Sequence, residues 1–404
     1  MKKIITCLFA VSILSVAAFS RNFFSQRYFE TKVGGSLGVS NNLLTANDFF
    51  TRDLVIDLRS LADECPDGGF NIRTNAAPVV ETNLNIKDFH LGFVTGVDMY
   101  QSMEIGKGLF DFLGYGNSIG ETVKVDMKNY ADIFAYSQVN LGLKFGKLKV
   151  KVQPTVFLPI ASIRGTGAEI TAVNDSDGNI NINMDMNMDI YSIVELESVN
   201  DFVGFNAASL ETAFLKGYGF DFGGGIAYEL SKSLSVGADF RIPIIPGHLN
   251  YKSNIQKSFE YSMNMLESGS NSSEPTSSDT VITNKEVNLP VHRPLKLNVY
   301  IDKNFLGTLF NARAGAGFGI KMPYTKDALF YPEYYLGFTL NLINVFKLGV
   351  SSQYTNQVFI HQLGTTLNVR IIQIDVGVSS QSSSFKKSLS VSGVGVYTYI
   401  TVGF

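Results

Sequence analysis

The sequence predicts an all-β fold, a transmembrane antiparallel β-barrel of about fourteen strands, within a range of roughly 14–16. Three observations support this class. Apolar and polar residues alternate with a period of two in many segments, the chain holds 37 Gly, 31 Phe and 18 Tyr, and its last residue is Phe404. Alternation places successive side chains on opposite faces of a strand, and glycine with aromatic residues suits closely packed strands that face lipid.

The N-terminal segment, residues 1–20, has the features of a secretory signal peptide. Lys2 and Lys3 precede an apolar run up to Phe19, and small residues around Ser20 offer a cleavage point. An uncleaved membrane anchor is the alternative, but the run is at the short limit for a spanning helix. We therefore expect export and a mature domain of residues 21–404, in which Cys65 is the single cysteine and forms no internal disulfide.

Composition and charge exclude several classes of protein. With 45% hydrophobic and 17% charged residues, the chain is neither disordered nor an array of hydrophobic helices. After residue 20 no uncharged apolar run approaches the roughly 18 residues of a spanning helix. A mature chain in a membrane must then form a closed barrel, because only that fold also satisfies every backbone group in lipid. The formal charge of −3 argues against nucleic acid as a partner.

Several segments show the alternation clearly, each with one apolar and one polar face. The apolar faces are Phe89, Leu91, Phe93, Val97 and Met99; Leu141, Leu143 and Phe145; Leu234, Val236, Ala238, Phe240 and Ile242; Leu295, Leu297, Val299 and Ile301; and Ile372, Ile374, Val376 and Val378. One face suits lipid and the other suits water. A soluble β-sandwich would rarely show so many strands of this kind.

Short polar turns join pairs of strands, and longer segments separate the pairs. The short turns lie near Lys87-Asp88, Gly146-Lys147, Ser231-Lys232, Asp302 to Asn304, Asn344 and Ile371. The long segments, assigned as external loops, lie at about residues 41–77, 102–130, 161–216 and 246–290, with a shorter one at 321–331. Strands are expected to begin near residues 31, 78, 89, 131, 147, 217, 233, 292, 307, 332, 345, 362, 372 and 389. Tight periplasmic turns and long external loops are typical of outer-membrane barrels and place both termini on the periplasmic side.

The predicted external segments differ in character. Asn47 to Cys65 has apolar residues at helical spacing with Asn47 as N-cap, which predicts an amphipathic helix that plugs the barrel mouth or lies across its rim. Residues 267–279 are rich in serine and predict a mobile surface loop. Residues 170–190, with a turn at 174–178, predict a hairpin that either extends a loop or adds two strands, for about sixteen in total.

The C-terminal segment, residues 389–404 (LSVSGVGVYTYITVGF), ends on an aromatic residue with apolar residues at alternate positions before it. It resembles the terminal strand by which the barrel-assembly machinery recognises outer-membrane barrels. The resemblance assigns that signal to Val396, Ile400, Val402 and Phe404, whereas Thr398 departs from the usual apolar or aromatic choice.

Three further segments resemble an uncharacterised family of spirochaetal outer-membrane β-barrels. They are residues 21–30 (RNFFSQRYFE), 53–66 (DLVIDLRSLADECP) and 109–120 (LFDFLGYGNSIG). The strand count and chain length are also similar to those of FadL-like fatty-acid channels. That similarity is one of architecture, because no matching ligand-site motif is present and residues 21–30 are too short for that family's N-terminal hatch.

No catalytic, cofactor or metal site is predicted. The histidines His90, His248, His292 and His361 are far apart in sequence and lie in no catalytic motif, so an enzyme is not expected. Residues 174–178 (NDSDG) partly match a calcium loop but lack the distal glutamate, and a turn stabilised by Asp and Gly is the favoured alternative.

Charged residues on the polar strand faces are the candidate lumen lining. They are Asp98, Lys144, Lys149, Lys151, Asp239, Arg241, Lys296, Asp302, Arg370 and Asp375. A dry core would not hold them without partners, so they either line a wet pore or pair with one another. Their mixed signs predict no strong ion selectivity.

Two functions fit this pattern. The first is a passive outer-membrane channel for small or hydrophobic solutes, with outer-membrane lipid and the assembly machinery as partners. The alternative is a surface-exposed structural or adhesive barrel with a plugged lumen.

Overall fold

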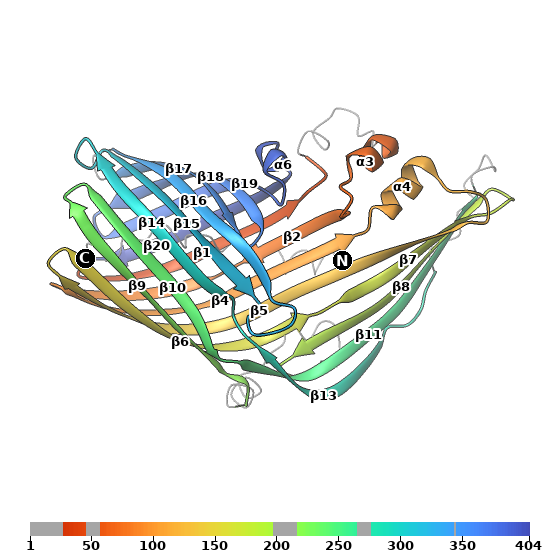
Figure 1. Cartoon of the computed structure of the whole chain (residues 1–404), viewed down its shortest axis with the longest axis horizontal. Coiled ribbons are helices and arrows are strands. Elements are labelled where there is room, and N and C mark those ends of the chain that lie inside the picture. The colour runs from red at the N-terminus through yellow and green to blue at the C-terminus, as the bar shows by residue number, and fades with distance from the viewer. Residues whose placement is uncertain (1–26, 46–56, 197–215, 265–275, 343–344) are drawn as a thin grey trace.

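The chain forms one antiparallel β-sheet that closes on itself (Figure 1). The computed structural model describes residues 27–45, 57–196, 216–264, 276–342 and 345–404. The first strand, β1 (Phe29–Asn41), pairs with the last, β20 (Gly393–Gly403). At the seam the Phe29 and Phe404 backbones exchange two hydrogen bonds of 3.1 and 3.0 Å. The prediction of a closed all-β antiparallel barrel is therefore confirmed.

Each strand of the wall pairs with its neighbours in a simple order. From β1 the wall passes through β2 (Phe70–Ala76) with β3 (Val79–Ile86), β4 (Phe89–Ile105), β5 (Thr122–Phe145), β6 (Leu148–Ile163), β9 (Gly219–Ser231), β10 (Leu234–Ile245), β14 (Leu295–Phe305), β15 (Phe310–Lys321), β16 (Leu329–Leu342), β17 (Phe346–Thr355), β18 (Val358–Val369), β19 (Ile372–Ser382) and β20. Strands β2 and β3 form one interrupted strand, because both pair with β1 and β4 and Pro78 between them has no N–H to donate.

Beyond one side of the barrel the sheet continues as an extension. It contains β7 (Thr166–Asn174), β8 (Asn179–Ser192), β11 (Gly247–Asn264), β12 (Thr276–Ser277) and β13 (Val281–Val291). Strand β7 pairs with the first part of β5, and β8 pairs with β7 and β11. The hairpin of residues 170–190 forms as β7 and β8 and belongs to this extension. The barrel has sixteen strands, the upper end of the predicted range, so the count of about fourteen is wrong.

The predicted external loops are shorter than expected because parts of them are strands. Strand β5 already begins at Thr122, inside the predicted loop 102–130, and β7, β8, β11 and β13 occupy much of 161–216 and 246–290. Strands β7 and β8 correspond to the predicted hairpin, whereas β11 and β13 were missed because their polar faces carry charges and amides in place of the small residues seen elsewhere. Tight turns lie where they were predicted at Lys87, Gly146 and Arg370, and all three residues have a positive φ. The prediction of a turn at Asp302 to Asn304 is wrong, because β14 continues to Phe305.

Among the described residues, three short helices lie outside the sheet: α3 (Leu58–Glu64), α4 (Gly108–Tyr115) and α6 (Phe385–Leu389). The prediction of a single helix from Asn47 to Cys65 is wrong, because Asp57 is extended and its side chain caps α3. Residues 46–56 lie outside the described chain. Helices α3 and α4 pack together around Leu43, Ala62, Cys65 and Phe110. In the described part of the chain, no helix has the length and apolar character to span a membrane. The leader, residues 1–20, and most of the Ser-rich segment also lie outside the described residues.

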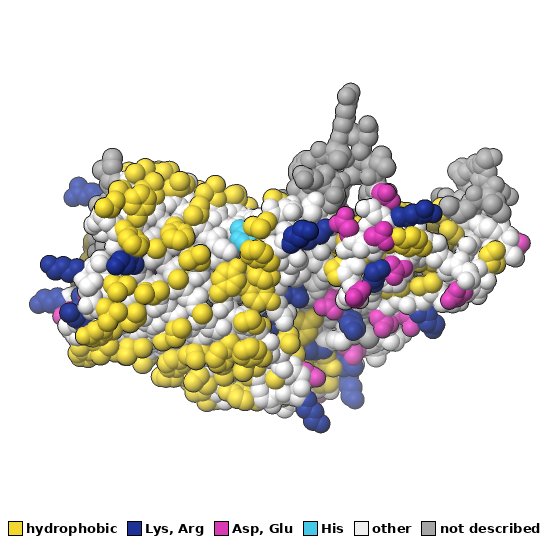
Figure 2. All heavy atoms as spheres, turned by 45° about the horizontal axis from the view of Figure 1, so that its top comes forward, with side chains coloured by type: hydrophobic (Ala, Val, Ile, Leu, Met, Phe, Trp, Pro, Cys, Tyr) yellow, Lys and Arg dark blue, Asp and Glu magenta, His cyan; other side chains and the backbone are white. Residues whose placement is uncertain are grey.

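The outer face of the barrel is apolar, and Figure 2 shows this belt over the body of the barrel with charged side chains at its ends. The exposed side chains include members of every alternating segment: Phe89, Phe93, Leu141, Leu143, Phe145, Ile242, Leu297, Val299, Ile301, Ile372, Ile374, Val376 and Val378. The intervening His90, Asn140 and Asn298 are buried. The predicted two-faced strands are confirmed, with the apolar face outward.

Tyrosine rings fill the space left by inward-facing glycines. A Cβ on Gly377 would lie 2.3 Å from the ring of Tyr397 on the next strand, and one on Gly319 would lie 2.2 Å from the ring of Tyr331. Glycine is required at both positions because the ring lies directly over the backbone.

Candidate functional site

The interior of the barrel is polar, in contrast to its outer face. The buried polar side chains include Asn71, Glu81, Asn83, His90, Asn140, Asp221, Arg293, Asn298, Lys321, Glu333, Gln353 and Gln381. Burying so many polar groups is costly unless they find partners, and most of them do. The partners identify the candidate site.

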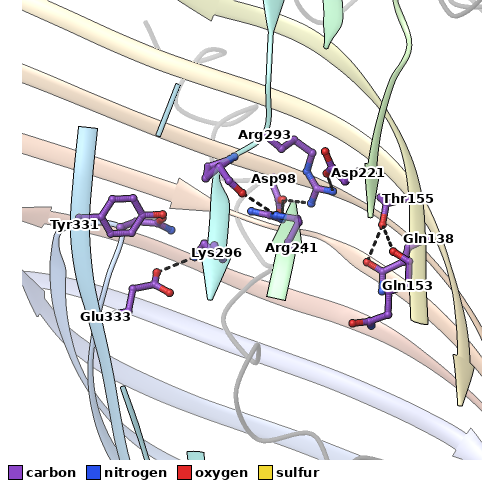
Figure 3. A network of polar contacts seen from close by, with 12 residues as sticks. Asp98, Gln138, Gln153, Thr155, Asp221, Arg241, Arg293, Lys296, Tyr331 and Glu333 are labelled. Atoms are coloured by element: carbon purple, nitrogen blue, oxygen red, sulfur yellow. Dashed lines mark hydrogen bonds and ion pairs between the residues drawn. The ribbon is translucent and has the colours of Figure 1, made fainter. Parts of the chain in front are cut away.

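Arg293 is at the centre of this polar interior, between β13 and β14. It is 3% exposed, and its Nη1 and Nη2 contact Asp221 Oδ2 at 3.0 Å and Asp98 Oδ2 at 2.7 Å (Figure 3). Its guanidinium lies 4.4 Å from the ring centroid of Tyr136. Arg241 lies 3.9 Å from the same Asp98 oxygen and donates from Nε to the carbonyl of Pro294 at 3.0 Å. Two arginines therefore share one carboxylate.

A second group of contacts continues from Arg241 toward β16. Lys296 Nζ lies 2.8 Å from Glu333 Oε1, which also accepts a hydrogen bond of 2.6 Å from Thr355. Lys321 Nζ lies 3.1 Å from the ring centroid of Tyr100 and 5.8 Å from that of Tyr331. Both lysines are held by a carboxylate or by aromatic faces rather than by water.

These contacts cross the lumen, because they join strands that do not pair. Asp98 and Tyr100 lie on β4, which pairs with β2, β3 and β5, whereas Arg293 precedes β14 and Lys321 ends β15. We call the set the polar septum. Its members are Asp98, Tyr100, Asp221, Arg241, Arg293, Lys296, Lys321, Tyr331 and Glu333.

A small cavity lies beside the polar septum. A cavity lined by Arg73, Tyr100, Thr355 and Asn356 has a volume of about 10 Å³, which holds about one water molecule. A larger hollow of about 420 Å³ is lined mainly by Leu348, Leu363, Val376, Val378 and Val396. Their exposed side chains belong to the outer belt, so this hollow faces away from the interior.

An amide cluster lies beside the polar septum on β5 and β6. Asn140 Oδ1 accepts hydrogen bonds from Gln138 at 2.5 Å and Gln153 at 2.8 Å, and Thr155 donates to Gln138 at 3.2 Å (Figure 3). These neutral groups satisfy one another and leave no charge to balance.

Two apolar clusters interrupt the polar interior. The first cluster consists of Phe134, Phe157, Leu158, Ile193, Leu249 and Val291, and the second cluster of Val79, Val94 and Tyr399. Tyr136 packs against both. Because Arg293 stacks on Tyr136, the polar septum and the apolar contact between the two clusters meet at one ring.

Nine of the ten predicted lumen residues fall into three groups. Asp98, Arg241 and Lys296 belong to the polar septum. Lys144 and Lys149 lie 4.0 and 2.8 Å from Glu229, Asp302 accepts from Asn311 at 2.7 Å, and Asp375 accepts from Thr366 at 2.5 Å. Lys151 and Asp239 face Gly225 from either side, on β6 and β10. Arg370 lies apart from all of these, exposed in the turn between β18 and β19.

Four central residues were not predicted: Asp221, Arg293, Lys321 and Glu333. Asp221 carried a readable signal, since it is an acid between Phe220 and Phe222 within an alternating segment. Arg293 carried none, because it stands between His292 and Pro294 outside any alternating pattern.

The turn at residues 174–178 is the predicted Asx turn. Asp175 Oδ1 accepts hydrogen bonds of 2.9 Å from the backbone N–H groups of both Asp177 and Asn179, and Gly178 has a φ of 81°. The carboxylate is thus used to close the hairpin.

Comparison with known proteins gives a likeness of fold. No family model and no curated protein sequence matches this chain. Among solved structures, the chain is similar to the P. putida toluene transporter TodX, with a TM-score of 0.51 and 9% identity over 95% of this chain and 91% of that one. It is also similar to the CymD monoaromatic hydrocarbon channel, with a TM-score of 0.44 and 14% identity over 94% of this chain and 89% of that one. The TodX likeness confirms, as a likeness of fold, the predicted similarity to FadL-like channels.

Proposed function

We propose that this protein is a passive outer-membrane channel for small apolar solutes and that it is closed at rest. The observation that carries the proposal is the pair of apolar clusters inside a polar lumen, joined through Tyr136. A barrel with a purely structural role needs no apolar contact between two clusters inside its lumen. An apolar solute moving through the barrel would find partners in the first cluster, at Tyr136 and in the second cluster.

The solute class follows from the size and chemistry of these clusters. They are lined by Phe, Tyr, Val, Leu and Ile side chains, which favour compact apolar molecules and offer aromatic rings a stacking partner. TodX, whose fold is similar, is a toluene transporter. We therefore assign monoaromatic hydrocarbons, or apolar molecules of similar size, as the cargo.

The remaining expectations belong to the same proposal. The leader of residues 1–20 directs export, the terminal residues Val396, Ile400, Val402 and Phe404 present the assembly signal, and the apolar belt contacts outer-membrane lipid. The predicted lumen charges line the lumen, apart from Arg370, which lies in an exposed turn. No residue is assigned a catalytic role.

The test is uptake of a fluorescent apolar dye, N-phenyl-1-naphthylamine, by cells that display the protein in an outer membrane. The polar outer leaflet slows entry of such dyes, so expression should accelerate uptake. Val94 in the second cluster is 3% exposed, and Val94→Asp should abolish the gain, whereas Lys326→Ser in an exposed loop should leave it unchanged. Uptake that is the same with and without the protein would contradict the proposal, provided that heat-modifiable migration shows folded barrel.

An adhesive surface barrel is the second candidate, and the extension of the sheet favours it. The amide of Asn254 bonds to Asn187 and Asp189 at 2.7 and 2.9 Å, and Ser258 and Ser262 donate to Asp185 and Asn181 at 2.7 Å. The resulting ladder of Asn, Asp and Ser presents regularly spaced hydrogen-bonding groups. Replacing Asp185 and Asn187 by alanine separates the two functions, because an adhesin would lose binding to matrix proteins while a channel would keep its uptake.

A further inference from the structure

We propose that the polar septum is the ion barrier of the lumen and that Arg293 is its central residue. The inference rests on the proposed function only in that it specifies how the channel is closed. In this scheme the lumen is closed by side chains that meet across it, with no segment of the described chain inserted as a plug.

The side chains of the polar septum join several strands of the wall. Arg293 reaches β4 through Asp98 and β9 through Asp221, and Lys321 reaches Tyr100 on β4 from the end of β15. At the same end of the barrel Arg73 Nη1 donates to the carbonyl of Gln357, in the turn between β17 and β18, at 2.5 Å. The contacts therefore reach across the lumen from several sides of the wall.

Four charged side chains of the polar septum are almost fully buried. Arg293 and Asp221 are 3% and 0% exposed, and Glu333 and Lys321 are 4% and 6% exposed, whereas the Asp98 side chain is 38% exposed. An ion passing between the buried groups must displace a partner from a buried charge, which is unfavourable. Removing the Arg293 side chain leaves the buried Asp221 carboxylate without this partner, and such a group draws in water.

The polar septum contains an alternative pairing for the Asp98 carboxylate. Asp98 Oδ2 lies 2.7 Å from Arg293 and 3.9 Å from Arg241, so a small movement exchanges one arginine for the other. Arg293 Nε and Asp221 Oδ1 have no hydrogen-bond partner in the described structure, which leaves both groups capacity for a second arrangement. A closure with two arrangements is suited to opening and reclosing.

The ion barrier and the apolar contact meet at the ring of Tyr136. Arg293 lies on the face of Tyr136, and Tyr136 is the ring between the first and second clusters. If Arg293 leaves Asp98 for a second arrangement, it also uncovers this ring. Arg293 thus excludes ions at rest and controls access to the apolar contact.

The experiment is single-channel recording of the refolded protein in planar lipid bilayers, with apolar dye uptake measured in parallel. The natural protein should show almost no steady current. Arg293→Ser should give a steady ohmic current at least about tenfold higher, because its wetted lumen is an aqueous path. Arg370→Ser, in an exposed turn, is the matched control and should behave as the natural protein does.

Glu333→Gln is a second variant for the case in which Arg293→Ser does not fold. It removes the charged partner of Lys296 and should also raise the current. The proposal is overturned if folded Arg293→Ser and Glu333→Gln both stay silent, or if the natural protein already conducts like an open pore. If the variants conduct but no form accelerates dye uptake, the barrier stands and the proposed cargo falls.

Discussion

The central prediction concerns a charge placed on the outer wall, and the perturbation is Val376→Arg. Val376 lies on β19, points outward and is 42% exposed. Ile372, four residues earlier on the same face, is 46% exposed, directly after the tight turn at Arg370. The two sites are equally open in the folded protein, so solvent exposure alone predicts equal costs for an arginine.

Depth in the membrane predicts different costs. At about 3.3 Å per residue and a strand tilt of about 40°, Val376 lies about 10 Å deeper than Ile372, near the middle of an apolar band about 25 Å tall. Arginine costs about 2–4 kcal/mol at the midplane and about 0–1 kcal/mol near the interface. A difference of about 3 kcal/mol corresponds to roughly a hundredfold change in the folding equilibrium.

The assay is reversible urea unfolding in phospholipid vesicles. The chain contains no tryptophan, so the folded fraction is read from heat-modifiable gel migration and from far-ultraviolet circular dichroism. Val376→Leu is the matched control and should change the free energy of unfolding little. Equal costs for arginine at Val376 and Ile372, or a larger cost at Ile372, would refute the assignment of the outer belt to lipid.

Four further outcomes follow from the interior, the seam and the external helices. Gly377→Ala should destabilise the barrel by about 1–3 kcal/mol through overpacking, and Tyr397→Ala should remove much of that cost, which a double-mutant cycle in the same unfolding assay measures. Phe404→Ser should lower the yield of heat-modifiable protein in the membrane fraction, and an unchanged yield would count against the terminal signal. Burial raises the pKa of the Cys65 thiol, so its thiolate fraction at neutral pH is reduced and maleimide labelling should increase only as the pH rises above the usual cysteine range. Asp57→Ala removes the N-cap of α3, worth about 1 kcal/mol, and should accelerate labelling about fivefold, a change that would not occur if α3 held Cys65 independently of its cap.

The barrel itself could be predicted because its signal is local. Each strand in lipid must place apolar residues outward, so a pattern such as Ile372, Ile374, Val376 and Val378 carries the fold class within a few residues. The tight turns also carry local signals, as at Gly146, where a positive φ favours glycine. Of the external strands, β11 and β13 were missed because no lipid constrains them, and both of their faces tolerate polar residues.

The polar septum could be predicted only in part, because its contacts join distant segments. Asp98, Arg241 and Lys296 were readable as charges on polar faces, but nothing local shows that Asp98 meets Arg293 across the lumen. Which charges meet depends on the register of every strand between β4 and β14. Register is a property of the whole wall and is not encoded near either residue.

The seam between β1 and β20 has a consequence for biosynthesis. The strand that completes the wall, β20, is made after every other described strand, and it must pair with β1, the first of them. Until then the polypeptide carries two strand edges with unsatisfied hydrogen bonds, which invite aggregation. Because the closing contact joins the first and last described strands, the barrel is expected to fold slowly and as a whole. Any truncation that removes β20 should therefore yield an open sheet that is degraded rather than a smaller barrel.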